Sequence, residues 1–93
     1  MNLKDFFDTV KDDPRISTTH ISMYLAFVSC CGDTVYKKRH LINRPKIMQL
    51  AKISARSTYS KILHELDAYG YIRYRPDFGR NSTIEFIKLE GGV

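Results

Sequence analysis

Residues 55–72 read ARSTYSKILHELDAYGYI, and this stretch decides the fold of the 93-residue chain. Its first part carries apolar residues at intervals of three, four and seven, which is the spacing of one face of an α-helix. These residues are Tyr59, Ile62, Leu63 and Leu66. Gly70 stands where a left-handed residue commonly ends a helix, and from Tyr71 the period changes to two. The stretch therefore predicts a helix followed by a strand.

The other face of the predicted helix is polar and cationic. It consists of Arg56, Ser57, Ser60, Lys61 and His64. Acidic residues come only near the far end of the helix, at Glu65 and Asp67. Hydroxyl and basic side chains opposite an apolar back suit a groove lined with phosphates and base edges. We therefore interpret this stretch as a DNA-recognition helix.

The positive charge of the chain is concentrated in its middle. Residues 1–33 carry three basic and five acidic residues, a net charge of −2, whereas residues 34–93 carry twelve and five, a net charge of +7. Residues 34–61 contain eight basic residues and no acidic one. A local basic field of this kind is what a polyanion-binding surface requires. The alternative is a solvated, lysine-rich surface that serves only solubility.

Residues 1–15 form a separate predicted unit, an amphipathic helix over residues 2–12 that ends before Pro14. Its apolar face is formed by Leu3, Phe6, Phe7 and Val10. That face is too large to leave in water, so it either packs on the domain or meets its copy in a homodimer.

Residues 16–33 predict a helix at the centre of the core. Ser17 is a suitable N-cap, and the run of Cys30, Cys31, Gly32 and Asp33 is a stop signal. The main apolar stripe is Ile21, Tyr24, Leu25 and Val28, and it is widened by Met23, Ala26 and Phe27. A helix that is apolar over so much of its surface is expected to be central to the core.

A basic connector over residues 34–43 leads to a short further helix. The end of the connector, His40 to Ile42, is a candidate strand that docks against the later hairpin. Asn43 is expected to cap the helix, which has a proline in its first turn. The expected buried side is formed by Ile47, Met48, Leu50 and Ala51. The helix should end near Lys52, and a turn of about four residues then leads to the recognition helix.

Two strands over residues 71–75 and 83–89 complete the expected fold. A turn-rich tip at residues 76–82 joins them, and residues 91–93 form a tail. The fold class is therefore mainly α with a small β-hairpin (α+β). Helix, helix, turn, helix and hairpin follow one another in the order of a winged helix-turn-helix domain over residues 16–90, with an extra N-terminal helix before it.

The stretch from Thr58 to Ile72 resembles the recognition-helix signature of bacterial winged-helix regulators of the GntR and MarR types. As in those proteins, a threonine precedes the first core residue, and a leucine comes four residues before the glycine that opens the wing. The close match covers residues 54–72. The whole chain is also similar to small winged-helix proteins of bacterial mobile elements and phages.

The resemblance implies which residues contact DNA. The base-reading residues would be Arg56, Ser57, Thr58 and Ser60. Among them Arg56 is the best candidate, because its fork can bond two guanine acceptors at once. The phosphate-binding residues would be Arg44, Lys46, Lys52 and Lys61. The wing would contribute Arg75, Phe78, Arg80 and Asn81. The chain departs from the family at Ala55, where a serine is usual, and Ser54 is the alternative cap.

Other kinds of site are not predicted. The histidines and cysteines match no zinc-binding spacing, so we expect no metal and no cofactor. These residues are His20, His40, His64, Cys30 and Cys31. No histidine stands beside a serine, a cysteine or paired carboxylates in a recognisable arrangement, so we expect no enzyme. Most aromatic residues fall at core spacings, and Tyr36 and Phe78 are the exceptions to test for nucleic-acid contact.

Neighbouring cysteines on a helix point about 100° apart and are poor disulfide partners, so both are expected to be reduced thiols. The N-terminus shows no signal peptide, and no apolar run reaches membrane-spanning length. We therefore expect a cytoplasmic protein that binds neither a membrane nor a small-molecule ligand.

The expected function is sequence-specific binding of double-stranded DNA, by a dimer that regulates transcription. Two alternatives stay open. One is an accessory DNA-binding protein for replication or excision of a mobile element. The other is a winged-helix module for protein–protein interaction, in which the helix with Phe6 and Phe7 makes the contact.

Overall fold

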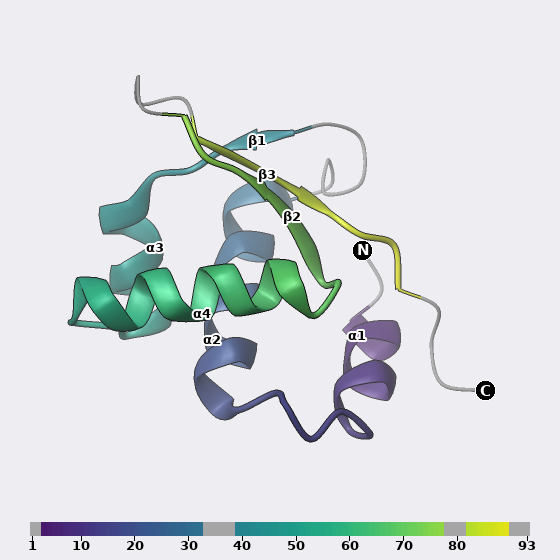
Figure 1. Cartoon of the computed structure of the whole chain (residues 1–93). Coiled ribbons are helices and arrows are strands. Elements are labelled where there is room, and N and C mark those ends of the chain that lie inside the picture. The colour runs from purple at the N-terminus through teal and green to yellow at the C-terminus, as the bar shows by residue number, and fades with distance from the viewer. Residues whose placement is uncertain (1–2, 33–38, 78–81, 90–93) are drawn as a thin grey trace.

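Helices make up most of the structure, a computed structural model that describes residues 3–32, 39–77 and 82–89. In chain order the elements are α1 (Leu3–Val10), α2 (Thr18–Cys31), β1 (His40–Leu41), α3 (Arg44–Ala51), α4 (Arg56–Ala68), β2 (Ile72–Arg75) and β3 (Thr83–Phe86). Figure 1 shows the small sheet lying across the helices, with α4 crossing in front of α2. The predicted α+β class, mainly helical with a small sheet, is confirmed at this level.

The three strands form one antiparallel sheet in the order β1-β3-β2. Tyr74 lies opposite Ile84, and Leu41 lies opposite Thr83. The predicted docking of a short strand from the connector against the hairpin is confirmed. The last strand is shorter than expected, because it ends at Phe86 and not at residue 89.

The starts of α2 and α3 follow from their caps. The Ser17 side chain accepts a hydrogen bond from the backbone N–H of His20, and the His20 ring in turn accepts from the Ser17 backbone, which completes a capping box. Asn43 Oδ1 accepts a hydrogen bond from the N–H of Lys46, at 3.2 Å. Both predicted caps are therefore confirmed.

The start of α4 differs from the other two. Its N-cap is Ala55, whose side chain makes no cap hydrogen bond, so Ser54 does not supply the alternative cap. The preceding turn consists of residues 52–55, and Lys52 begins it in the left-handed conformation with φ 60°. At the other end Gly70 has φ +88°, the conformation that its position predicts.

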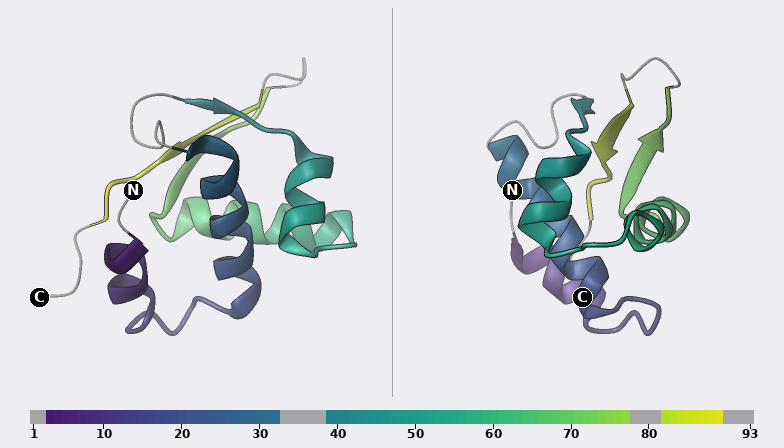
Figure 2. Two further views of the ribbon diagram at one scale, coloured as in Figure 1. Left: turned by 180° about the vertical axis from the view of Figure 1, so that it is seen from behind. Right: turned by 90° about the vertical axis from the view of Figure 1, so that its left-hand side faces the viewer.

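α2 is the central helix of the core, and it lies between α1 and α3 (Figure 2, left). Its most buried apolar residues are Met23, Tyr24, Ala26 and Phe27. The predicted main stripe was wrong in this respect, because Ile21, Leu25 and Val28 are only partly buried. A helix that is apolar nearly all round does not reveal which side its neighbours cover.

Two further core predictions need correction. Leu50 is 46% exposed, because α3 turns Ile47 and Ala51 towards the core and Leu50 lies to one side of them. Strand alternation from Tyr71 would place it on the same side as Arg73 and Arg75, away from the core, but Tyr71 is only 2% exposed. Tyr71 precedes β2, and its N–H donates a hydrogen bond to the carbonyl of Leu66. Its side chain is therefore placed by the end of α4 and not by the alternation of the strand.

α1 packs on the domain through part of its apolar face. Phe6 and Val10 are buried, and the Phe6 ring is stacked on Tyr24 with centroids 4.0 Å apart. Leu3 and Phe7 are each 43% exposed. Of the residues proposed for a homodimer contact, Phe6 and Val10 are therefore used within the chain. None of the helices in the described ranges is both long and apolar enough to cross a lipid bilayer.

Candidate nucleic-acid interface

The outward face of α4 is formed by polar residues that repeat with the helical period. Ser57, Lys61 and His64 are separated by four and three residues, and all three are exposed, as is Ser60 beside them. The buried side chains of α4 are those predicted from the sequence, namely Tyr59, Ile62, Leu63 and Leu66. The helix therefore presents an apolar side to the core and a polar side to solvent.

Arg56 and Thr58 lie at the two margins of this face. Arg56 precedes the buried Leu63 by seven residues, which places it near the core side, and it is exposed because it begins the helix. Thr58 precedes Glu65 by seven residues and lies on the opposite margin. The predicted base-reading residues thus all lie in the first turns of α4. Ser57 is near the centre of the outward face, and Arg56 is at its edge.

His64 belongs to the same face, although the sequence-based selection of contact residues omitted it. Its ring meets the ring of Tyr74 edge-on, with centroids 5.3 Å apart. This contact places His64 where α4 meets β2. The helical spacing from Ser57 and Lys61 would have been sufficient to include it.

The predicted phosphate-binding residues lie on α3, on the turn and on α4. Lys46, Lys52 and Lys61 are exposed. Arg44 is only half-buried in the first turn of α3, and its Nη1 lies 3.6 Å from the sulfur of Met48. Three of the four side chains are therefore open to solvent, and the fourth lies against its own helix.

These basic residues have no ion-pair partner in the described part of the chain. The contacts between acidic and basic side chains found there are Lys4–Asp8, Lys11–Asp12, Arg15–Asp13, Arg75–Glu85 and the hydrogen-bonded pair His20–Glu65. None of them involves Lys46, Lys52, Arg56 or Lys61. On the surface formed by α3, the turn and the start of α4, these charges have no carboxylate of a described residue within ion-pair distance.

A hollow of about 490 Å³ lies between the start of α3, α4 and the hairpin. It is lined by Ile42, Arg44, Pro45, Tyr59, Tyr74 and Ser82. Burial raises the pKa of Tyr59 to about 12, so its phenol stays neutral at physiological pH. The hollow thus combines one guanidinium with aromatic walls beside the outward face of α4.

The hairpin contributes less free charge than predicted. Nε of Arg75 lies 3.2 Å from Oε1 of Glu85, so this predicted wing residue is paired within the hairpin. Arg73 is exposed on the same side of β2, and the alternation of the strand would have identified it. The other predicted wing residues, Phe78, Arg80 and Asn81, lie outside the described residues, as does Tyr36.

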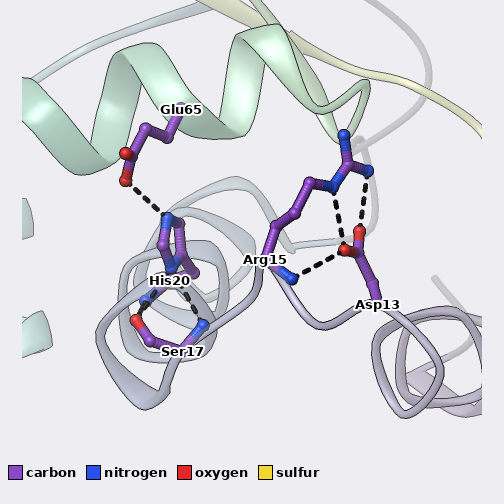
Figure 3. A network of polar contacts seen from close by, with 5 residues as sticks. All are labelled: Asp13, Arg15, Ser17, His20 and Glu65. Carbon is purple, nitrogen blue, oxygen red and sulfur yellow. Dashed lines mark hydrogen bonds and ion pairs between the residues drawn. The ribbon is translucent and has the colours of Figure 1, made fainter.

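A polar network fastens the start of α2 to α4 (Figure 3). Nδ1 of His20 accepts a hydrogen bond from the backbone N–H of Ser17 at 3.0 Å and lies 2.8 Å from its Oγ, while Nε2 lies 2.9 Å from Oε1 of Glu65. His20 therefore stands beside a serine and one carboxylate, a grouping that the sequence did not indicate. Because the backbone amide occupies the Nδ1 lone pair, this nitrogen is poorly placed to act as a general base, and the network serves to join the helices.

A second cluster lies beside it, before α2. The guanidinium of Arg15 donates two hydrogen bonds of 2.9 Å to the carboxylate of Asp13, and the hydroxyl of Tyr71 donates a third at 2.8 Å. The Arg15 hydrogen bond is the largest reason that the pKa of Asp13 is held well below its usual range. Arg15 also lies over the ring of Tyr69, 4.4 Å from its centroid. The segment between α1 and α2 is thus tied to the end of α4.

Within residues 3–32, 39–77 and 82–89, no three His, Cys, Asp or Glu side chains are grouped so that they could hold a metal ion. Neither Cys30 nor Cys31 forms a disulfide.

A scan of the chain against protein-family models gave no match, and searches of curated proteins and of solved structures gave no significant match either.

Proposed function

We propose that the chain binds double-stranded DNA as a winged helix-turn-helix protein, with α4 in the major groove. The arrangement that supports this reading is α2, β1, α3, a short turn, α4 and a hairpin, with β3 paired between β1 and β2. In helix-turn-helix proteins the second helix of the pair enters the groove, and its N-terminal residues contact base edges. Here that helix is α4.

The observation that carries the proposal is the exposed, unpaired basic surface on and around the first half of α4. Residues 39–63 contain no acidic side chain, and Lys46, Lys52, Arg56 and Lys61 are exposed without an ion pair among the described residues. Lysines at these positions can neutralise backbone phosphates. The hydroxyls of Ser57 and Ser60 lie between them and can reach base edges.

The start of α4 adds to this surface. Because Ala55 has no side-chain acceptor, the first amides of α4 have no side-chain cap. A phosphate at this end would accept from those amides. The same geometry leaves Arg56 able to reach a guanine when the helix lies in the groove.

We further propose a role in regulating transcription, with binding as a dimer. In this proposal Leu3 and Phe7 are the part of α1 that remains exposed for a second copy. Accessory binding during replication or excision of a mobile element would use the same surface of α4.

A protein-interaction module is the second candidate, and the hairpin is the feature that favours it. Arg75 is paired with Glu85, so the positive charge of α4 does not continue unbroken along the described part of the hairpin. In this case the docking surface would be α1 or the hairpin, and duplex DNA would not be bound.

The test is the affinity for a fluorescein-labelled duplex measured by anisotropy between 50 mM and 200 mM salt. If Lys46, Lys52 and Lys61 each neutralise one phosphate, log K should fall with log salt with a slope of about −3. Lys61→Ala should reduce the slope by about one, whereas the control Lys88→Ala, an exposed lysine beyond β3, should leave it unchanged. Absence of binding at low salt, or a flat salt response, would remove the proposal.

A further inference from the structure

A second hollow, of about 370 Å³, lies between the C-terminal end of α2, the strand β1 and the start of α3. The residues that matter for its chemistry are Phe27, Cys30, Arg39, Leu41, Lys46 and Ile47. α4 lies on the other side of α3 from the C-terminal end of α2 (Figure 2, right). The hollow is therefore separate from the outward face of α4.

One part of this hollow is apolar. Its inner wall is made by Phe27, Ile47 and Ile84, which belong to the core and are each 2% exposed or less. Leu41 stands at the rim and is 72% exposed, more than the other large exposed hydrophobic side chains of the described residues. A leucine held this far into water by an ordered strand can gain by contact with an apolar body in the hollow.

The other part of the hollow is cationic. Arg39 and Lys46 both line it, both are exposed, and neither forms an ion pair with a described residue. None of the described residues that line the hollow is acidic. A ligand that carried a negative charge would therefore meet two cations and no described carboxylate.

We propose that this hollow binds a small organic anion, with an aromatic or aliphatic body against Leu41 and a carboxylate or phosphate between Arg39 and Lys46. A volume of about 370 Å³ is at the small end of ligand pockets, which limits the ligand to one or two rings or a short chain. The site goes beyond DNA binding: it shares Lys46 with the proposed phosphate-binding surface, but no described residue of α4 lines it, and its ligand can be tested without DNA.

The test compares three probes of matched size or charge by ¹H–¹⁵N NMR titration of the full chain, without DNA. The probes are 2-naphthoate, its neutral counterpart 2-naphthamide, and inorganic phosphate. Cys30 is an exposed thiol in the wall, so the rate of its alkylation by iodoacetamide, read by peptide mass spectrometry, gives an independent measure of occupancy.

The proposal predicts that 2-naphthoate shifts the amides around the hollow and slows alkylation of Cys30. 2-Naphthamide and phosphate should bind at least about tenfold more weakly, because the amide lacks the negative charge and phosphate lacks the apolar body. Arg39→Gln with Lys46→Gln should weaken 2-naphthoate about tenfold with the far-UV circular dichroism spectrum unchanged, and the control Lys88→Gln should have no effect. Equal binding of acid and amide, shifts centred elsewhere, or an unaltered affinity of the double variant would overturn the proposal.

Discussion

Arg56 begins α4 with its side chain in solvent and without a side-chain cap before it. Its guanidinium charge is therefore next to the positive end of the helix dipole. Lys61 is exposed one turn further along, and neither residue has an ion pair in the described ranges. Two charges that contribute nothing visible to the fold are candidates for contact with a partner.

Arg56→Ala should weaken binding to a preferred duplex, chosen from a random library, by roughly tenfold or more, since a bidentate contact to guanine contributes about 1–3 kcal/mol. The melting temperature should change by no more than about 3 °C, because an exposed side chain without a partner contributes little to stability.

The matched variant Arg56→Lys separates two kinds of contact. It keeps the positive charge but removes the guanidinium group that donates two parallel hydrogen bonds. The variant should therefore lose most of the sequence preference and still bind arbitrary duplexes. A large fall in melting temperature for Arg56→Ala would show that the side chain belongs to the fold, and an unchanged affinity would show that it does not reach the bases.

The helix α1 is attached to the domain through its two buried side chains, Phe6 and Val10. The Phe6 ring is stacked on Tyr24 and meets Tyr71 edge-on, with centroids 6.1 Å apart. Val10 is buried with it, while Leu3 and Phe7 face solvent. α1 is thus a part of the core and not a free arm.

Phe6→Ala should lower the free energy of unfolding by about 3–5 kcal/mol, since it removes a buried ring and leaves a cavity. Phe7→Ala is the matched control, because Phe7 is the next residue on the same helix and is 43% exposed, and it should cost about 1 kcal/mol or less. The comparison is made by urea denaturation of both variants. Similar losses for the two would show that α1 does not pack as described.

The positions of elements could be read from local signals in the sequence. Ser17, Asn43 and Gly70 bound their helices as expected, because caps depend on residues within one turn. The apolar side of α4 was identified for a similar reason, since its polar residues leave only one face to bury.

Other features depend on contacts that are distant in sequence. His20 and Glu65 are 45 residues apart, and no local pattern brings them together. The burial of Tyr71 depends on its contacts with Phe6 and Asp13, on a segment that precedes α2. The exposed candidates of the DNA interface were found from charge and periodicity, whereas the pairing of Arg75 with Glu85 required the register of the hairpin.

Asp13 joins the N-terminal segment to the residues that follow α4, through its hydrogen bond with Tyr71. Its carboxylate accepts from Arg15 and Tyr71, and these hydrogen bonds favour the charged form and lower its pKa. A carboxyl whose pKa is lower in the folded state stabilises the fold above its unfolded pKa of about 4. That contribution is lost as the pH falls from about 4 towards the folded value.

Asp13→Asn should therefore lower the melting temperature by the same amount at every pH between about 5 and 7. In this range the carboxyl is charged in both the folded and the unfolded chain, because its unfolded pKa is about 4. Below about pH 4 the difference between the wild-type chain and the variant should shrink, because Asp13 of the unfolded wild-type chain becomes protonated while Asp13 of the folded chain stays charged. Melting curves of both proteins at each pH are sufficient, since the other carboxylates are common to both. A difference that did not depend on pH would show that the charge of Asp13 is not what fastens the segment.

Paired and unpaired charges lie in different parts of the molecule. Three of the ion pairs involve residues before α2, whereas the basic residues of α3, the turn and the start of α4 are unpaired among the described residues. A polyanion approaching this molecule would therefore meet basic side chains around the start of α4 that have no ion-pair partner among the described residues.

The most direct measurement is a ¹H–¹⁵N NMR titration of the chain with a short duplex at low salt, which records every amide at once. We expect the largest shifts on residues 56–61 and on Lys46 and Lys52, and unchanged amide signals for α1. Shifts centred on α1 or on the outer face of the hairpin, or no shifts at all, would contradict it.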